Sequence, residues 1–294
     1  MQFTISKEFL ESIPEEESKH FTDPTGLTAE YIRSLSDEGL ERFCTFTTYL
    51  EIAGMVTGFA NTAEKEHPRL KKTEFEIILT HDGTLGKLSH FHSQPNNFRL
   101  TFDQDYFESL TKEEQKALLA HEIGHLCCGH LDGKKEPASI VEQWDKGIKQ
   151  LDEGAKSLGI NAKRIGLDPE QLELSKNQRK EREAIRMAVR LYPNPKAHID
   201  CALKECYWFT GTTTKKELQD VINDKNDTNR YVRQGDRVHP AYASQIAEIV
   251  HTAKELAKEG LCEPVDEDYL RATLPAVLRT RINYAHTSHT GQAR

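Results

Sequence analysis

The stretch TKEEQKALLAHEIGHLCCGHLDG, residues 111–133, decides how this sequence folds. Thr111 and Glu114 have the spacing of a capping box, in which two side chains and two backbone N–H groups satisfy each other at a helix start. Gly133 and, a little later, Pro137 are typical of a helix end. The sequence therefore predicts one helix with a defined start and a defined end.

This helix carries the residues of a candidate metal site. His121 and His125 are four positions apart, so both imidazoles project from one helix face and can bind a single metal ion. Glu122 follows the first histidine, and the HExxH arrangement uses that carboxylate to take a proton from a metal-bound water. A catalytic zinc binds three protein ligands and keeps one position open, so a third ligand has to come from elsewhere.

Three residues close to the motif are poor candidates for the third ligand. His130 lies five positions after His125, which turns it about 140° away from the ligand face. It is interpreted as a helix-end residue, near the negative end of the helix dipole. Cys127 and Cys128 fall off the ligand face or beyond its reach, and buried free cysteines commonly serve packing.

A better candidate lies in KEREAIRMA, residues 180–188. Glu181 shares a helix face with small or apolar residues, namely Ala184, Ile185 and Ala188. A carboxylate on that face points at the core, where it needs a partner. Glu183 faces about 160° away from Glu181. Glu181 is therefore predicted as the third ligand, and a surface glutamate in a charged run is the alternative.

Hydrophobic periodicity predicts an α+β fold that is mainly helical. Apolar residues recur at helical intervals over residues 27–63 and again over 175–192, where the helix stops at a PNP sequence. Short strands separated by turn residues are predicted at 75–80, 87–92 and 98–102. Two or more helices follow in the last third of the chain. The strands are expected to form a small antiparallel or mixed sheet.

The chain is predicted to hold a single main domain. Residues 1–26 are expected to form an irregular acidic arm, and residues 27–280 the domain itself. Residues 134–178 are highly charged with an apolar stripe, which predicts a charged helical insertion of unassigned role. Residues 281–294 are expected to be a flexible tail, because they lack apolar periodicity.

Composition and charge exclude several classes of partner. The formal net charge of −8 argues against a nucleic-acid-binding surface. No secretory signal is visible, and no apolar stretch approaches the roughly 20 residues that span a bilayer. The six cysteines lack framework spacing, which indicates a cytoplasmic or other reducing compartment. A protein exported without a leader into another cell would look the same.

Three segments together resemble a family of zinc peptidases. LLAHEIGHLCCGH resembles the active-site helix of the HExxH-Glu zinc peptidases (gluzincins) that include the CAAX prenyl endopeptidases and the HtpX peptidases. KEREAIRMA is similar to their ExxAD ligand helix, and RVHPAYASQIAEI, residues 237–249, to their later HPxxxxRI element. The resemblance spans roughly residues 98–250. A second resemblance, to the ImmA/IrrE-like peptidases, is carried by EREAIRMAVRLYP.

The resemblance implies a zincin-like domain, with its small sheet packed on the active-site helix, and a zinc metalloendopeptidase with one Zn2+ per chain. His121, His125 and Glu181 would bind the zinc, and Glu122 would act as general base. His239 would lie near the scissile carbonyl, where an imidazole can donate a hydrogen bond to the forming oxyanion.

The resemblance also implies how a substrate binds. FRLTF, residues 98–102, matches the sheet edge along which an extended protein or peptide substrate adds by backbone hydrogen bonds. No membrane span is expected here, so prenylated substrates are not implied. The substrate itself and the oligomeric state are left open.

Two positions depart from the family pattern. Gln245 stands where an arginine is usual, and Ile185 stands where an aspartate helps to orient a zinc-binding histidine. Loss of such an outer contact typically changes metal affinity or activity by about 10- to 100-fold. Either another acid supplies the contact, or the site is weakened. The alternative function is a non-catalytic zinc-binding scaffold that keeps the peptidase fold.

Overall fold

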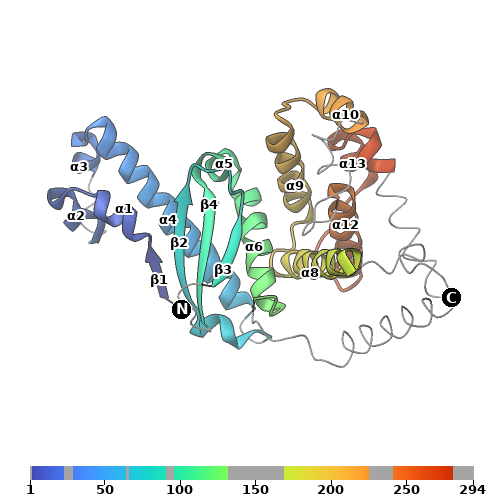
Figure 1. Ribbon diagram of the computed structural model, residues 1–294, viewed down its shortest axis with the longest axis horizontal. Coiled ribbons are helices and arrows are strands. Elements are labelled where there is room, and N and C mark those ends of the chain that lie inside the picture. The colour runs from blue at the N-terminus through green and yellow to red at the C-terminus, as the bar shows by residue number, and fades with distance from the viewer. Residues whose placement is uncertain are drawn as a thin grey trace. The chain divides into compact units, whose positions relative to one another are not determined.

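The computed structural model (Figure 1) describes residues 2–22, 29–63, 66–90, 96–131, 169–224 and 241–280. The chain divides into two compact units, Met1–Ile123 and Gly124–Arg294. The division falls inside helix α6 (Lys112–Cys127), so the end of this one helix belongs to the second unit.

The first unit contains a small mixed sheet, which confirms the α+β class. Its strands are β1 (Gln2–Ile5), β2 (Glu74–Thr80), β3 (Lys87–His90) and β4 (Asn97–Asp103). Their order in the sheet is β1-β2-β4-β3. β1 and β4 both run parallel to β2, whereas β3 pairs antiparallel with β4.

Strand β4 confirms the predicted alternation but not the predicted edge position. Phe98, Leu100 and Phe102 are fully buried, while Arg99 and Thr101 between them are partly exposed. β4 lies between β2 and β3, so the expectation that FRLTF forms a substrate-binding edge is wrong. A period of two identifies the buried face of a strand but not its neighbours. Among the described strands, β1 and β3 form the edges.

Helices lie around the sheet of the first unit (Figure 1). They are α1 (Lys7–Ser12), α2 (Glu15–Thr22), α3 (Ala29–Ser34), α4 (Asp37–Thr62), the 3-10 helix η2 (Pro68–Lys72), α5 (Gln104–Ser109) and the start of α6. The helical periodicity over 27–63 thus corresponds to α3 and α4. Ser36 caps α4 by accepting a hydrogen bond from the N–H of Gly39, and the helix buries Tyr49, Ile52 and Val56.

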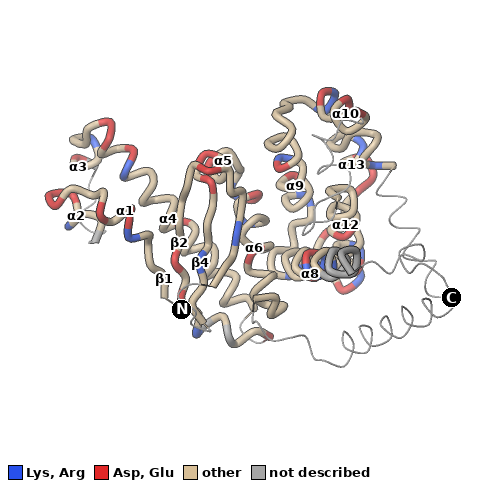
Figure 2. The backbone as a smooth tube through the Cα atoms, in the orientation of Figure 1, with Lys and Arg blue, Asp and Glu red and all other residues tan. Residues whose placement is uncertain are grey.

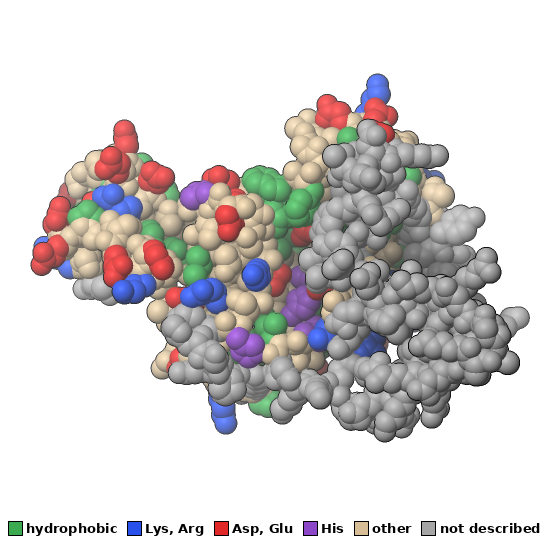
Figure 3. Space-filling view, in the orientation of Figure 1, with side chains coloured by type: hydrophobic (Ala, Val, Ile, Leu, Met, Phe, Trp, Pro, Cys, Tyr) green, Lys and Arg blue, Asp and Glu red, His purple; other side chains and the backbone are tan. Residues whose placement is uncertain are grey.

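The expected irregular arm is wrong for residues 2–22, which form β1, α1 and α2. Residues 2–5 pair with residues 74–77 of β2, and Phe3 stacks on Phe75. A four-residue strand is too short to show periodicity, and its partner lies far along the chain. The N-terminal segment is acidic, as expected, and acidic side chains are prominent around α1, α2 and α3 (Figures 2 and 3).

The second unit is helical in its described part. After the end of α6 it contains α8 (Pro169–Leu191), α9 (Pro195–Thr210), α10 (Lys215–Asn223), α12 (Tyr242–Lys258) and α13 (Glu267–Thr273). α12 packs against both α8 and α9. Their contact faces form a hydrophobic core whose fully buried members include Val189, Ile199, Cys206 and Ile246. The predicted helix over 175–192 is confirmed, although it begins earlier, at Pro169.

Some expectations fall on residues that the structure does not describe. The charged insertion over 134–178 is described only from residue 169, where α8 begins, and the tail 281–294 and His239 lie outside the described residues. The single domain over 27–280 stays a prediction. Within the described ranges, the helices are too short or too polar to cross a membrane.

Candidate metal centre

Helix α6 starts and ends with well-formed caps. The N–H of Thr111 donates to Glu114 Oε2 at 2.6 Å, and the N–H of Glu114 donates to Thr111 Oγ1 at 3.3 Å, which completes the predicted capping box. At the other end, the N–H of Gly129 donates to the Leu126 carbonyl and the N–H of His130 to the His125 carbonyl. Gly129 has a φ of 70°, so these bonds form a Schellman motif. The helix ends at Cys127, before the expected Gly133.

The structure brings the three predicted ligands together. One ligand atom each from His121, His125 and Glu181 lie within 4.8 Å of one another. Both histidines come from α6, a single continuous helix, and Glu181 comes from α8. His125 Nε2 lies 3.4 Å from Glu181 Oε1. These three residues could therefore hold a metal ion.

The chemistry of this group fits zinc. Zinc bonds of about 2.0–2.1 Å in a tetrahedron place neighbouring ligand atoms about 3.3 Å apart. The 3.4 Å between His125 Nε2 and Glu181 Oε1 matches that separation. The Glu181 side chain is only 7% exposed. A buried carboxylate of this kind needs a positive partner, which a cation provides.

The close approach of α6 and α8 depends on Gly124. A Cβ at this position would lie 2.6 Å from the Ala184 carbonyl oxygen, closer than any real contact. Gly124 thereby lets the backbone of α8 come near enough for Glu181 to face His125. This role was not predicted from the sequence, although a glycine inside a helix costs about 1 kcal/mol relative to alanine and thus signals a packing requirement.

Glu122 is buried beside the start of an edge strand. The residue is 7% exposed. Its Oε1 lies 3.2 Å from the place that a Cβ on Gly86 would occupy. Gly86 directly precedes β3, so the carboxylate of the predicted general base lies next to the residue that leads into this edge strand.

His130 lies at the helix end, as expected. It is not a member of the candidate metal group, but it contacts one member, His125. Its Nδ1 lies 3.0 Å from His125 Nδ1, and its Nε2 lies 3.1 Å from Glu183 Oε2. Burial lowers the pKa of His130, although the hydrogen bond to Glu183 acts in the opposite direction. From the sequence, Glu183 was only the poorer alternative to Glu181, and this contact was not predicted.

The two cysteines after the motif lie outside the candidate metal group, and burial favours their thiol form. Burial raises the pKa of Cys127 to about 12 and that of Cys128 to about 11. Neither belongs to the group that could hold a metal. This agrees with the expectation that they serve packing.

Ile185, which stands where the resembled family usually has an aspartate, is a core residue. Ile185 is 5% exposed and belongs to the hydrophobic core of the second unit, together with Val189 and Ile246. The position therefore supplies packing and no hydrogen-bond acceptor.

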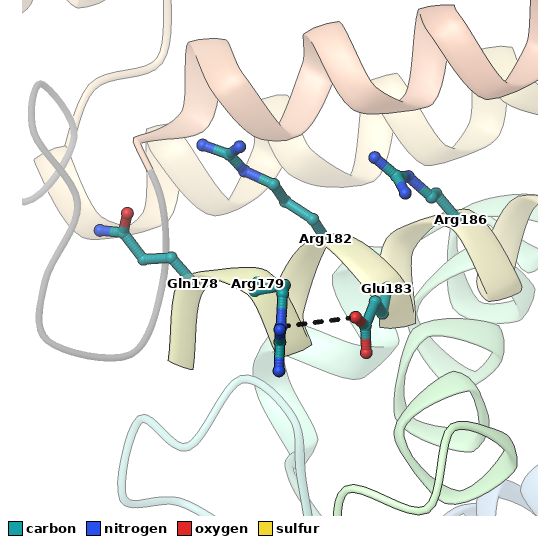
Figure 4. Close-up of a pocket in the computed structure, with 5 residues that line it drawn as sticks. All are labelled: Gln178, Arg179, Arg182, Glu183 and Arg186. Carbon is teal, nitrogen blue, oxygen red and sulfur yellow. Dashed lines mark ion pairs between the residues drawn. The ribbon is translucent and has the colours of Figure 1, made fainter. Parts of the chain in front are cut away.

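A pocket of about 390 Å³ lies along α8. Its lining residues are Gln178, Arg179, Arg182, Glu183 and Arg186 (Figure 4). Arg179 Nε lies 3.7 Å from Glu183 Oε1, and Arg186 pairs with Glu248 of α12. Glu183 thus borders this basic pocket with one carboxylate oxygen and reaches His130 with the other.

No family model, curated protein or solved structure matches this chain. The family resemblance therefore rests on the sequence motifs and stays an expectation.

Proposed function

We propose that this protein is a zinc-dependent endopeptidase that hydrolyses peptide bonds in a protein substrate. The observation that carries the proposal is the group formed by His121, His125 and Glu181, whose ligand atoms lie within 4.8 Å. Two histidines and one glutamate are the protein ligands of several catalytic zinc sites, which leave one position for water. Glu122, on the same helix, adds the base that peptide hydrolysis needs.

Each residue of the site has a chemical role in this proposal. Zinc, when bound, lowers the pKa of a water molecule toward 7 and polarises the substrate carbonyl. His121, His125 and Glu181 hold the ion, two of them through neutral imidazole nitrogens. Glu122 accepts the proton of the attacking water and then passes it to the leaving amine. His239, outside the described residues, is proposed to donate a hydrogen bond to the oxyanion.

Strand β3 is the proposed substrate-binding edge, in place of FRLTF. β3 pairs with β4 on one side and lies at the edge of the described sheet. Gly86, which precedes it, lies against the Glu122 carboxylate. An extended peptide that adds to β3 by backbone hydrogen bonds would pass close to the general base. This arrangement favours an extended peptide as the substrate.

The test compares wild type with Glu122→Gln, using zinc content and cleavage of a denatured-protein mixture followed by mass spectrometry. The variant is expected to keep zinc and to lose internal cleavage by a factor of at least about 100, because general-base catalysis contributes about 10²–10⁴-fold. Glu113→Gln is the matched control, since Glu113 lies in the exposed first turn of the same helix. It should cleave at the wild-type rate.

Two results would count against the proposal. Cleavage by Glu122→Gln at the wild-type rate would remove Glu122 as the base. Bound zinc in a wild-type protein that hydrolyses no peptide would instead favour the scaffold function.

A further inference from the structure

A chain of side-chain contacts leads outward from one proposed zinc ligand. His125 presents Nε2 to Glu181, at 3.4 Å, and Nδ1 to His130, at 3.0 Å. His130 in turn presents its Nε2 to Glu183 Oε2, at 3.1 Å. The ring of His125 is therefore held on both sides, with one nitrogen toward the ligand group and one toward His130.

When His125 binds a metal through Nε2, its ring hydrogen lies on Nδ1. A carboxylate is only an acceptor, so His130 Nε2 carries the hydrogen that it donates to Glu183. His130 Nδ1 is then free to accept, and His125 Nδ1 donates to it. This tautomer leaves the lone pair of His125 on Nε2, the nitrogen that faces Glu181 and would bind the metal.

The local backbone explains why His130 can reach this place. The Schellman motif at Gly129 turns the chain back, so His130 lies over the last turn of α6 rather than continuing away from it. Its side chain is 7% exposed, whereas that of Glu183 is 41% exposed and is approached by Arg179. The chain of contacts is therefore buried at His130, beside the proposed zinc ligand His125, and exposed to solvent at the Glu183 carboxylate.

We propose that His130 and Glu183 are positioning residues that orient His125 for metal binding and replace the aspartate that Ile185 does not supply. The inference rests on the proposed zinc site. It assigns functions to two residues that bind neither metal nor substrate.

The same contacts exclude a simpler role for His130. Both of its ring nitrogens are engaged, one by His125 and one by Glu183. Of the described residues, only His121, His125 and Glu181 form a group that could hold a metal. His130 therefore acts through His125.

The test measures zinc affinity by competition with a chromophoric chelator. His130→Phe keeps a ring of similar size, and Glu183→Ala removes the acceptor. Each should weaken zinc binding by about 10- to 100-fold. The double variant should be no weaker than the poorer single variant, because the two residues act in series. Glu183→Gln keeps an acceptor oxygen and should recover part of the affinity.

The chain offers a matched control in another histidine–glutamate pair. His251 Nε2 lies 3.3 Å from Glu255 Oε1 on the surface of α12. Glu255→Ala should bind zinc as wild type does. A circular dichroism spectrum and a melting curve for each variant show that the fold is retained.

A second measurement tests the inference without metal. Two-bond ¹⁵N–¹H correlation spectra of zinc-free protein report which ring nitrogen of each histidine carries the hydrogen, and His130→Phe identifies the His130 signals. His130 should carry its hydrogen on Nε2, the nitrogen that faces Glu183, in wild type and become a mixture of tautomers in Glu183→Ala.

The remaining outcomes test the positioning role, the choice of ligands and the proposed function separately. Variants within twofold of wild type, beside a Glu181→Ala that loses zinc, would overturn the positioning role and leave the proposed function intact. Loss of zinc in His130→Phe as complete as in His121→Ala, with Glu183→Ala unchanged, would make His130 a ligand and overturn the inference. A wild-type protein that binds no zinc would overturn the proposed function, while the spectra would still decide whether Glu183 sets the tautomer of His130.

Discussion

Substitution of Gly124 by alanine should separate helix α6 from helix α8 and open the metal site. The new Cβ would lie 2.6 Å from the Ala184 carbonyl oxygen and needs about 0.8 Å more to reach ordinary contact at 3.4 Å. The obstacle is backbone, which cannot turn aside as a side chain does. Overpacking of this kind costs about 1–3 kcal/mol, of which better helix propensity returns about 1 kcal/mol.

The same displacement acts on the ligands. His125 follows Gly124 directly, and its Nε2 lies 3.4 Å from Glu181 Oε1. A shift of about 0.8 Å would exceed the roughly 0.2 Å that metal-ligand distances tolerate. Zinc affinity should therefore fall by more than about tenfold, alongside a net loss in free energy of unfolding of up to about 2 kcal/mol.

The assay pairs Gly124→Ala with Gly54→Ala, using thermal denaturation and chelator competition. Gly54 lies in α4, where a Cβ would meet nothing within 4 Å. That control should gain up to about 1 kcal/mol from helix propensity and leave zinc binding unchanged. The two substitutions are thus expected to change the free energy of unfolding in opposite directions. Equal stabilisation of both variants, with zinc retained, would refute the close-approach role of Gly124.

Two further predictions concern the residues around the site. Gly86→Ala would place a Cβ 3.2 Å from Glu122 Oε1 and 3.1 Å from Leu118 Cδ1, so each atom must move by about 0.2–0.3 Å to reach ordinary contact at 3.4 Å. It should lower kcat by up to about tenfold at unchanged zinc content, because a misplacement of ~1 Å costs about 10²-fold. An unaltered kcat would argue against Glu122 as the base. Iodoacetamide at pH 8 should modify exposed Cys44 well before Cys127, whose pKa of about 12 keeps it a thiol until the pH approaches that value. Peptide mass spectrometry reads out the modification, and equal rates at the two cysteines would contradict the burial of Cys127.

The parts of the fold that follow from local patterns were predictable from the sequence. The capping box of Thr111 and Glu114 needs only residues three apart, and the structure forms it with both hydrogen bonds. The alternation in β4 likewise depends on one strand and one buried face. The order of the strands was not predictable, because β1 reaches β2 from a distant part of the chain and β4 lies between β2 and β3.

The candidate site likewise has parts that could be predicted from the sequence and parts that could not. The i, i+4 spacing of His121 and His125 sets their common face, and the apolar surroundings of Glu181 point it inward. The roles of Gly124 and Glu183 depend on where two helices meet, which helical periodicity within either one does not specify. The Ile185 departure left two interpretations open, a contact supplied by another acid or a weakened site, and it did not point to Glu183.

The position of Ile185 also limits how this protein can change. Its side chain lies in the core formed with α9 and α12, where an unpaired carboxylate would cost several kcal/mol, on the order of the penalty for a buried uncompensated charge. A single Ile185→Asp substitution would therefore destabilise the second unit, whatever the new aspartate contacted. The role proposed for Glu183 suits its own position better, because its side chain is 41% exposed and its charge stays in contact with solvent.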